Sequence, residues 1–481
     1  MKRITTLLTA GLFALTAACG GGDKPSPKTG ADGKTGTGPG GAPALSKDAQ
    51  AKFNAALDLF VDHDKKNDWT SDACNDVAKK FDEVGRNAQA LFNSGLAYQR
   101  CNDDKNAKAK FEAALQADPK FHHARAQLAL YQYKADGNED AAISALQQAV
   151  TDAQFQNVPA LVNLAMVQMA RDSAQGGQGC KDDMDCAKLN LQRALAIDDA
   201  YMPAFNQLAL YYFQLAKKRA GAVKGTSKTS KGRQIITHAH QQKRADVQQL
   251  ELAALVCSQA IRKNPNYAPI HNTAGLIQNE LGQVNGAVAE FATAAKLDPK
   301  LFEAQMNYAF VNLGFRGFEQ AQGAFKKALE MRPNDYDAHL GMALALRGPI
   351  TGSETDYDQR VAAVQAELDA AKKIDPNRPD AYYNEGILTQ EFKAKAGGAK
   401  EKTIAELENA KKIFQTFLEK AAGKPEYDGA VKRVKGDGSK KDLGRLGDID
   451  DTIAFLKLDA NAQKDAANQS SAEAASEAEK K

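Results

Sequence analysis

The segments FEAALQADPK (residues 111–120), FATAAKLDPK (291–300) and FKKALEMRPN (325–334) are three versions of one pattern. In each, an Ala lies four residues before the Phe and another lies three residues after it, so the three side chains form one apolar stripe on a helix. A Pro eight residues after the Phe ends that helix. A small residue sixteen positions before the Phe lets a preceding helix approach closely. The pattern predicts a recurring helix–turn–helix unit.

This unit resembles the tetratricopeptide repeat (TPR), whose 34-residue helix–turn–helix has the same small, aromatic and closing Pro residues. Following the small residue of each first helix locates eight units, at Gly95, Ala129, Ala165, Ala209, Gly275, Ala309, Ala343 and Gly386. Repeats of this kind bury their apolar faces only against their neighbours. The resemblance therefore implies an all-α fold, a TPR α-solenoid in which the units stack into a right-handed superhelix.

The rest of the chain is organised around these repeats. We expect a lipoprotein signal peptide at 1–18, a Gly/Pro/Lys-rich tether at 19–45, an N-terminal helical pair at 46–86, eight TPR-like units at 87–422, a C-terminal capping region at 423–458 and a disordered tail at 459–481. Polar stretches that lengthen the spacing of the repeats predict insertions at 172–185, 217–246, 347–358 and 393–401.

The N-terminus has the features of a secretory signal. A short basic start precedes an apolar run that is too short to span a bilayer, and small residues come directly before Cys19. This junction resembles a lipobox, although its Leu lies one place early, at Leu15. The resemblance implies that Cys19 is lipidated and, since no Asp follows it, that the protein is anchored in the outer membrane and faces the periplasm. The alternative is ordinary secretion with a free Cys19.

The other cysteines fit an oxidising compartment. Cys180 and Cys186 flank a short polar loop, which favours a disulfide over a metal site because no second ligand pair accompanies them. Cys74 and Cys101 lie at helix ends that an antiparallel array brings together, so a second disulfide is an even alternative to two free thiols. Cys257 lies on an apolar helix face and is expected to be a buried thiol.

Partner binding is expected on the concave surface, which the first helices line in proteins with this repeat. The register places there Val162, Met166, Met169, Leu210, Phe213, Asn272, Asn279, Met306, Phe310 and Leu313. This set is more apolar than a solvated face needs to be, and exposed apolar stripes indicate a partner. The alternative is that the register is shifted by one residue and these side chains pack between helices.

The insertion at 217–246 is strongly basic. Nine basic residues and no acidic residue lie between positions 217 and 244: Lys217, Lys218, Arg219, Lys224, Lys228, Lys231, Arg233, Lys243 and Arg244. We expect a basic loop that contacts the cell wall, anionic lipid or an acidic partner, or else a solvated loop without a partner. His238 and His240 in this segment lack further ligands for a metal site.

The sequence contains no catalytic constellation, and we expect neither enzymatic activity nor a cofactor or metal. The net charge of +3 does not favour nucleic-acid binding. Lipidated TPR proteins of this plan resemble the TPR lipoprotein of the adventurous gliding motility machinery, which implies a scaffold for other envelope proteins. They also resemble pilotin-like lipoproteins that assemble pili or the outer membrane. A cell-wall-binding regulator that uses the basic loop is a further alternative.

Overall fold

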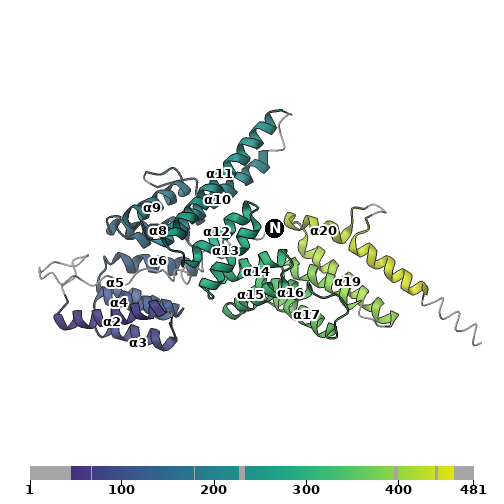
Figure 1. The fold of residues 1–481 in the computed structure, drawn as a ribbon, viewed down its shortest axis with the longest axis horizontal. Helices are drawn as coiled ribbons and strands as arrows, with labels where there is room; N and C mark the ends of the chain where they lie inside the picture. The colour runs from purple at the N-terminus through teal and green to yellow at the C-terminus, as the bar shows by residue number, and fades with distance from the viewer. Residues whose placement is uncertain are drawn as a thin grey trace, which may run out of the picture. The chain divides into compact units, whose positions relative to one another are not determined.

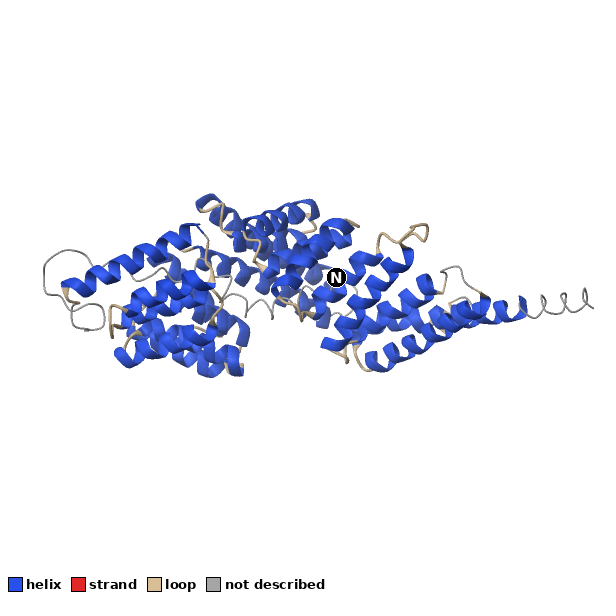
Figure 2. Ribbon diagram, turned by 90° about the horizontal axis from the view of Figure 1, so that it is seen from below, coloured by secondary structure: helices blue, strands red, loops and turns tan. Residues whose placement is uncertain are grey.

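The computed structural model describes residues 45–459 except 67, 178, 227–232, 395–398 and 439–441, with the backbone alone for 220–226 and 233–246. The described residues form helices joined by loops and contain no strand (Figure 2). The predicted signal peptide, most of the tether and the C-terminal tail from residue 460 lie outside the described residues. Cys19, Lys228 and Lys231 lie outside them as well.

The helices follow one another in pairs, as a TPR α-solenoid requires (Figure 1). An N-terminal pair, α2 (Lys47–Lys66) and α3 (Ser71–Asp82), precedes the repeats. The eight repeated pairs are α4 (Ala88–Arg100) with α5 (Asp104–Ala117), α6 (His122–Asp136) with α7 (Glu139–Asp152), α8 (Val158–Arg171) with α9 (Asp183–Ile197), α10 (Met202–Thr226) with α11 (Arg233–Lys263), α12 (Ala268–Glu280) with α13 (Val284–Leu297), α14 (Phe302–Gly314) with α15 (Phe318–Met331), α16 (Tyr336–Arg347) with α17 (Tyr357–Ile374), and α18 (Pro379–Leu388) with α19 (Lys400–Ala421).

The last pair differs from the others and is followed by a short cap. A five-residue π-helix, η1 (Thr389–Lys393), continues α18. After α19 come a 3-10 turn, η2 (Pro425–Tyr427), the short helix α20 (Asp428–Lys435) and a final helix over residues 444–459. Val434, Ile449 and Ile453 of this cap are buried in the same apolar cluster as Phe414 and Phe417 of α19.

The chain divides into two compact units, residues 1–304 and 305–481, and the division falls in the first turn of α14. In the first unit, one core cluster joins α2–α3 to the first repeat, and a second extends from α6 to α10. In the second unit, one cluster joins α16, α17 and α18, and another joins α18 and α19 to the C-terminal cap.

Side-chain caps and a close approach of helices explain why these segments fold as pairs. Asn87, Asp103 and Asn138 each accept a hydrogen bond from the backbone N–H three residues later, which fixes the start of a helix at about 1 kcal/mol apiece. Within the first pair, a Cβ added to Gly95 would lie 2.6 Å from the ring of Phe111. The small residue thus makes room for the aromatic ring, as the spacing predicted.

The basic insertion is the main departure from expectation. The prediction of a basic loop is wrong for residues 217–226 and 233–246, which continue α10 and α11 as helices. The two long helices run side by side as a hairpin (Figure 1). The segments are rich in Ala, Lys, Arg and Gln, which are good helix formers, so they extend the repeat helices instead of interrupting them.

Candidate interaction surfaces

The structure divides the predicted concave residues into two groups. Five are buried: Val162, Met166, Met169, Phe213 and Met306. Five are half-buried: Leu210, Asn272, Asn279, Phe310 and Leu313. The buried side chains pack in the core, which agrees with the alternative interpretation of the sequence that they lie between helices. Only the half-buried group is accessible to a partner.

Contacts between successive first helices explain this burial. Val162, Met166 and Met169 lie in one apolar cluster, and partly buried side chains of α6 and α10 pack against it, among them Tyr133 and Leu210. Each first helix therefore covers the next. The stripe that looks exposed when one repeat is considered alone becomes interior when repeats stack.

Buried and partly buried polar contacts also connect first helices. Gln99 of α4 donates a hydrogen bond to Gln127 of α6 at 3.2 Å and another to the hydroxyl of Tyr131 at 3.1 Å. Thr273 of α12 donates to Asn206 of α10 at 2.6 Å, and both side chains are buried. These bonds satisfy polar groups that burial would otherwise penalise, and they fix the register of neighbouring repeats.

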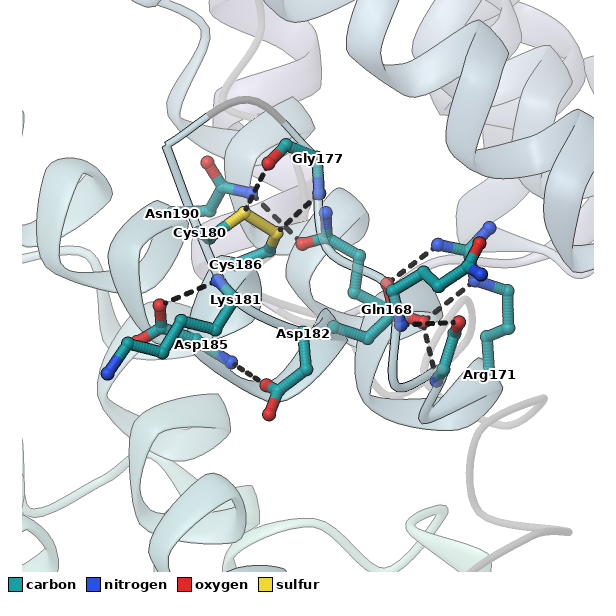
Figure 3. Close-up of a disulfide and its surroundings, with 12 residues drawn as sticks. Gln168, Arg171, Gly177, Cys180, Lys181, Asp182, Asp185, Cys186 and Asn190 are labelled. Atoms are coloured by element: carbon teal, nitrogen blue, oxygen red, sulfur yellow. Dashed lines mark hydrogen bonds and ion pairs between the residues drawn. A yellow bond between two sulfur atoms is a disulfide. The ribbon is translucent and has the colours of Figure 1, made fainter.

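The insertion between α8 and α9 is a compact, cross-linked loop (Figure 3). The disulfide between Cys180 and Cys186 is present, as the sequence favoured. At the base of the loop, the Arg171 guanidinium binds the Asp183 carboxylate through two hydrogen bonds of 2.7 and 2.6 Å. The carboxylate also accepts from the N–H of Ser173 at 2.8 Å. Burial raises the pKa of Asp183, but these hydrogen bonds outweigh it and the net pKa is lowered.

The candidate disulfide between Cys74 and Cys101, which the sequence left as an even alternative to two free thiols, is also present. It joins α3 to the end of α4, and an ion pair reinforces the junction nearby. Asp64 accepts two hydrogen bonds from Arg100, at 2.8 and 3.1 Å, and one from the indole N–H of Trp69 at 2.9 Å. The N-terminal pair is thus fixed to the first repeat by covalent, ionic and apolar contacts together.

Cys257 is a buried thiol, 1% exposed, and burial raises its pKa to about 12. A thiol with such a pKa is inert at neutral pH. Over the described part of the chain, no cluster of three or more His, Cys, Asp or Glu side chains is arranged to hold a metal ion. Nor is any helix of those residues long and apolar enough to cross a bilayer.

One repeated contact was missed by sequence reasoning. The fourth residue of four first helices donates a hydrogen bond to the carbonyl of a Pro six residues earlier: Arg125 to Pro119, His271 to Pro265, His339 to Pro333, and Tyr382 to Pro376. We call this contact the proline latch. The signal available in the sequence is a long donor side chain six residues after the closing Pro.

In three of the four latches the donor also pairs with a carboxylate on a second helix. The partners are Asp152 for Arg125, Glu290 for His271 and Glu367 for His339. Each of these three latches therefore joins the turn between two repeats, the start of a first helix and the second helix of a pair. This satisfies a carbonyl at the end of a helix, where intrahelical partners are missing.

The match of one segment to a family model supports the fold. Residues 88–121 match the family model described as tetratricopeptide repeat. No curated protein matches the chain. Among solved structures, a thermophilic TPR protein of Thermus thermophilus shares 25% identity, covering 47% of this chain and 98% of its own, with a TM-score of 0.36. A tetratricopeptide repeat protein of Parabacteroides merdae shares 14% identity, covering 63% of this chain and 99% of its own, with a TM-score of 0.34. PilF of Pseudomonas aeruginosa shares 15% identity, covering 56% of this chain and 97% of its own, with a TM-score of 0.37. The helix pairs and the matched repeat make this chain a TPR α-solenoid, a fold suited to protein–protein interaction.

Proposed function

We propose that this protein is a membrane-anchored, periplasm-facing TPR scaffold that recruits protein partners into an envelope complex. The observation that carries the proposal is the run of eight consecutive helix pairs from α4 to α19. Stacked pairs form an extended surface along which partners bind side by side. The repeats occupy most of the described chain, so the proposal assigns it binding and not catalysis.

The anchor and the location are proposed from the sequence and from the cysteines. The signal-like start, the junction before Cys19 and the polar tether have the order found in lipoproteins, which would place the solenoid beside the outer membrane. The bridges Cys74–Cys101 and Cys180–Cys186 support export, because disulfides persist in oxidising compartments.

The machinery we propose is that of gliding motility. The length of the solenoid, the tether and the long insertions resemble its TPR lipoprotein, whereas pilotin-like lipoproteins that assemble pili or the outer membrane are usually shorter. A second candidate function is binding to the cell wall. The observation that favours it is the basic segment 217–246, which carries nine Lys and Arg residues and whose described parts, 217–226 and 233–246, extend α10 and α11.

The test of the scaffold is crosslinking in intact cells, followed by recovery of the protein with its partners. We would compare the wild type with Asn279→Lys and Leu313→Glu, which change half-buried residues of first helices. Gln259→Lys, on an exposed position of α11, is the matched control. Envelope proteins recovered by wild type and control but lost from a variant support the proposal. Recovery of cell-wall fragments that stops when residues 217–246 are deleted, with no protein partner found, contradicts it.

A further inference from the structure

His122 and Asn157 connect the starts of two successive first helices. His122 is the first residue of α6, and Asn157 precedes α8 as its N-cap. The side-chain nitrogen Nδ2 of Asn157 lies 2.9 Å from Nδ1 of His122. This contact therefore joins the second repeat to the third.

The capping role of Asn157 fixes the direction of this hydrogen bond. Its Oδ1 atom accepts a hydrogen bond from the backbone N–H of Ala160 at 3.0 Å, so the NH₂ group of the same amide faces His122. An amide NH₂ group can only donate, which makes Nδ1 of His122 the acceptor. The imidazolium form carries a proton on both nitrogens and cannot accept this bond. Only the neutral form of His122 can therefore make this contact between the two repeats.

A second histidine makes a positive charge at this point still less favourable. The ring centroid of His123 lies 4.2 Å from that of His122, and the rings of Phe92 and Phe121 lie 5.6 and 5.4 Å from it. Its Nδ1 atom is buried and has no hydrogen-bond partner among the described residues. Burial, and then the neighbouring His122, lower the pKa of His123 to about 4. The pair is thus built for two neutral rings.

The charged groups around His122 act in opposite directions. Burial lowers its pKa, the carboxylates of Asp152 and Asp118 raise it, and Arg125 lowers it again, with a lowered pKa as the result. Asp152 already binds Arg125, and Asp118 accepts a hydrogen bond from the backbone N–H of Lys120 at 2.9 Å, so both carboxylates are engaged elsewhere. Because the folded-state pKa is lowered, the contact stabilises the fold above the unfolded pKa of about 6.5 and is lost as pH falls through the folded value.

The two helices that this contact holds together share an apolar core. Ala126 and Ala129 of α6 are buried in the same cluster as Val162 and Met166 of α8. A first helix that loosens at its first turn is less able to cover the next one. The packing between α6 and α8 is therefore expected to weaken when the bond between their starts is broken.

We propose that His122 and Asn157 form an acid-sensitive joint, which holds α6 against α8 at neutral pH and loosens when His122 is protonated. The joint does not depend on the proposed scaffold function. It would let acid change the apolar surface that the second and third repeats offer to other proteins.

Hydrogen–deuterium exchange of the purified full chain tests the proposal at pH 7.5 and pH 5.0, with exchange times corrected for the intrinsic pH dependence. Peptides from α6 and α8 report on the joint, and peptides from α18 and α19 are the internal reference. His122→Asn keeps an acceptor near the position of Nδ1 but does not titrate. Asn157→Asp keeps the N-cap and replaces the donor by an acceptor, which favours the imidazolium. His63→Asn is the matched control, because His63 pairs with a carboxylate that is about half exposed.

We expect α6 and α8 of the wild type and of the His63→Asn control to exchange at least about tenfold faster at pH 5.0 than at pH 7.5, relative to the reference peptides. His122→Asn should show little of this pH dependence, and Asn157→Asp should show the opposite one. Equal acceleration in His122→Asn and the wild type overturns the proposal. Equal acceleration of α18 and α19 overturns it too, because acid then loosens the whole chain. If Asn157→Asp does not fold, the comparison of His122→Asn with the wild type decides alone.

Discussion

The imidazole of His271 is held between two acceptors, with Nδ1 2.7 Å from a carboxylate oxygen of Glu290 and Nε2 2.9 Å from the carbonyl of Pro265. Only the imidazolium form carries an N–H on both nitrogens, so the proline latch fits the protonated ring. The hydrogen bond to Glu290 raises the pKa of His271, burial lowers it, and the bond to Pro265 raises it again, with a raised pKa as the result.

The first prediction concerns the pH dependence of this latch. Because the folded-state pKa is raised, the contribution of His271 to stability is fully present below the unfolded pKa of about 6.5 and is lost as pH rises through the folded value. We expect His271→Gln to lower the free energy of unfolding by about 1–2 kcal/mol at pH 5.5 and by less at pH 9. Thermal or urea unfolding at both pH values measures this.

His63 provides the control for that experiment. Its ring pairs with Asp68 at 2.6 Å, but the Asp68 side chain is about half exposed, so His63→Gln should change stability little. A His271→Gln effect of the same size at both pH values would show that the latch stabilises the fold without titrating.

The second prediction concerns the close approach of paired helices. A Cβ on Gly275 would lie 2.6 Å from the ring of Phe291, and both residues are buried. Gly275→Ala should therefore destabilise the protein by about 1–3 kcal/mol. At Gly323, in the middle of α15, nothing lies within 4 Å of an added Cβ, so Gly323→Ala should stabilise by about 0.5–1 kcal/mol. Denaturant unfolding distinguishes the two, and changes of equal sign would contradict the packing described here.

The sequence predicted the helix pairs because each repeat carries its own local signals. The stripe around Phe111 and the Pro that ends α5 act within one repeat, so single-repeat reasoning was sufficient for them. The short loop spacing of Cys180 and Cys186 was likewise local and favoured their disulfide, whereas the pairing of Cys74 with Cys101 depends on contact between helices and stayed an even alternative.

Features that depend on contacts between repeats could not be predicted in this way. Met166 lies on the face that the repeat pattern assigns to partner binding, but the neighbouring first helices bury it. The proline latch joins His271 to a carboxylate nineteen residues away on another helix, a pairing that no single-helix pattern shows. The hydrogen bond between Asn157 and His122 likewise forms only when two successive first helices start side by side.

The third prediction compares the two disulfides. Cys74 and Cys101 are 27 residues apart, whereas Cys180 and Cys186 are 6 apart. If the bridges act by limiting the unfolded chain, removing the longer crosslink with paired Ser substitutions should cost about 3–4 kcal/mol and removing the shorter one about 2 kcal/mol. Unfolding of each double variant under non-reducing conditions measures this order. The reverse order would mean that the loop between α8 and α9 contributes native contacts that depend on its bridge.

The fourth prediction tests the anchor, on which the proposed location depends. The proposed membrane attachment depends on the lipid that we expect at Cys19. Acyl chains bind a bilayer by about 0.8 kcal/mol for each buried CH₂ group. Cys19→Ala should therefore move the protein from the membrane fraction to the soluble fraction of the cell without changing its melting temperature, whereas Cys257→Ala should leave it with the membranes. If the Cys19→Ala protein stayed with the membranes and was released only by deleting the basic segment 217–246, that segment and not a lipid would be the attachment.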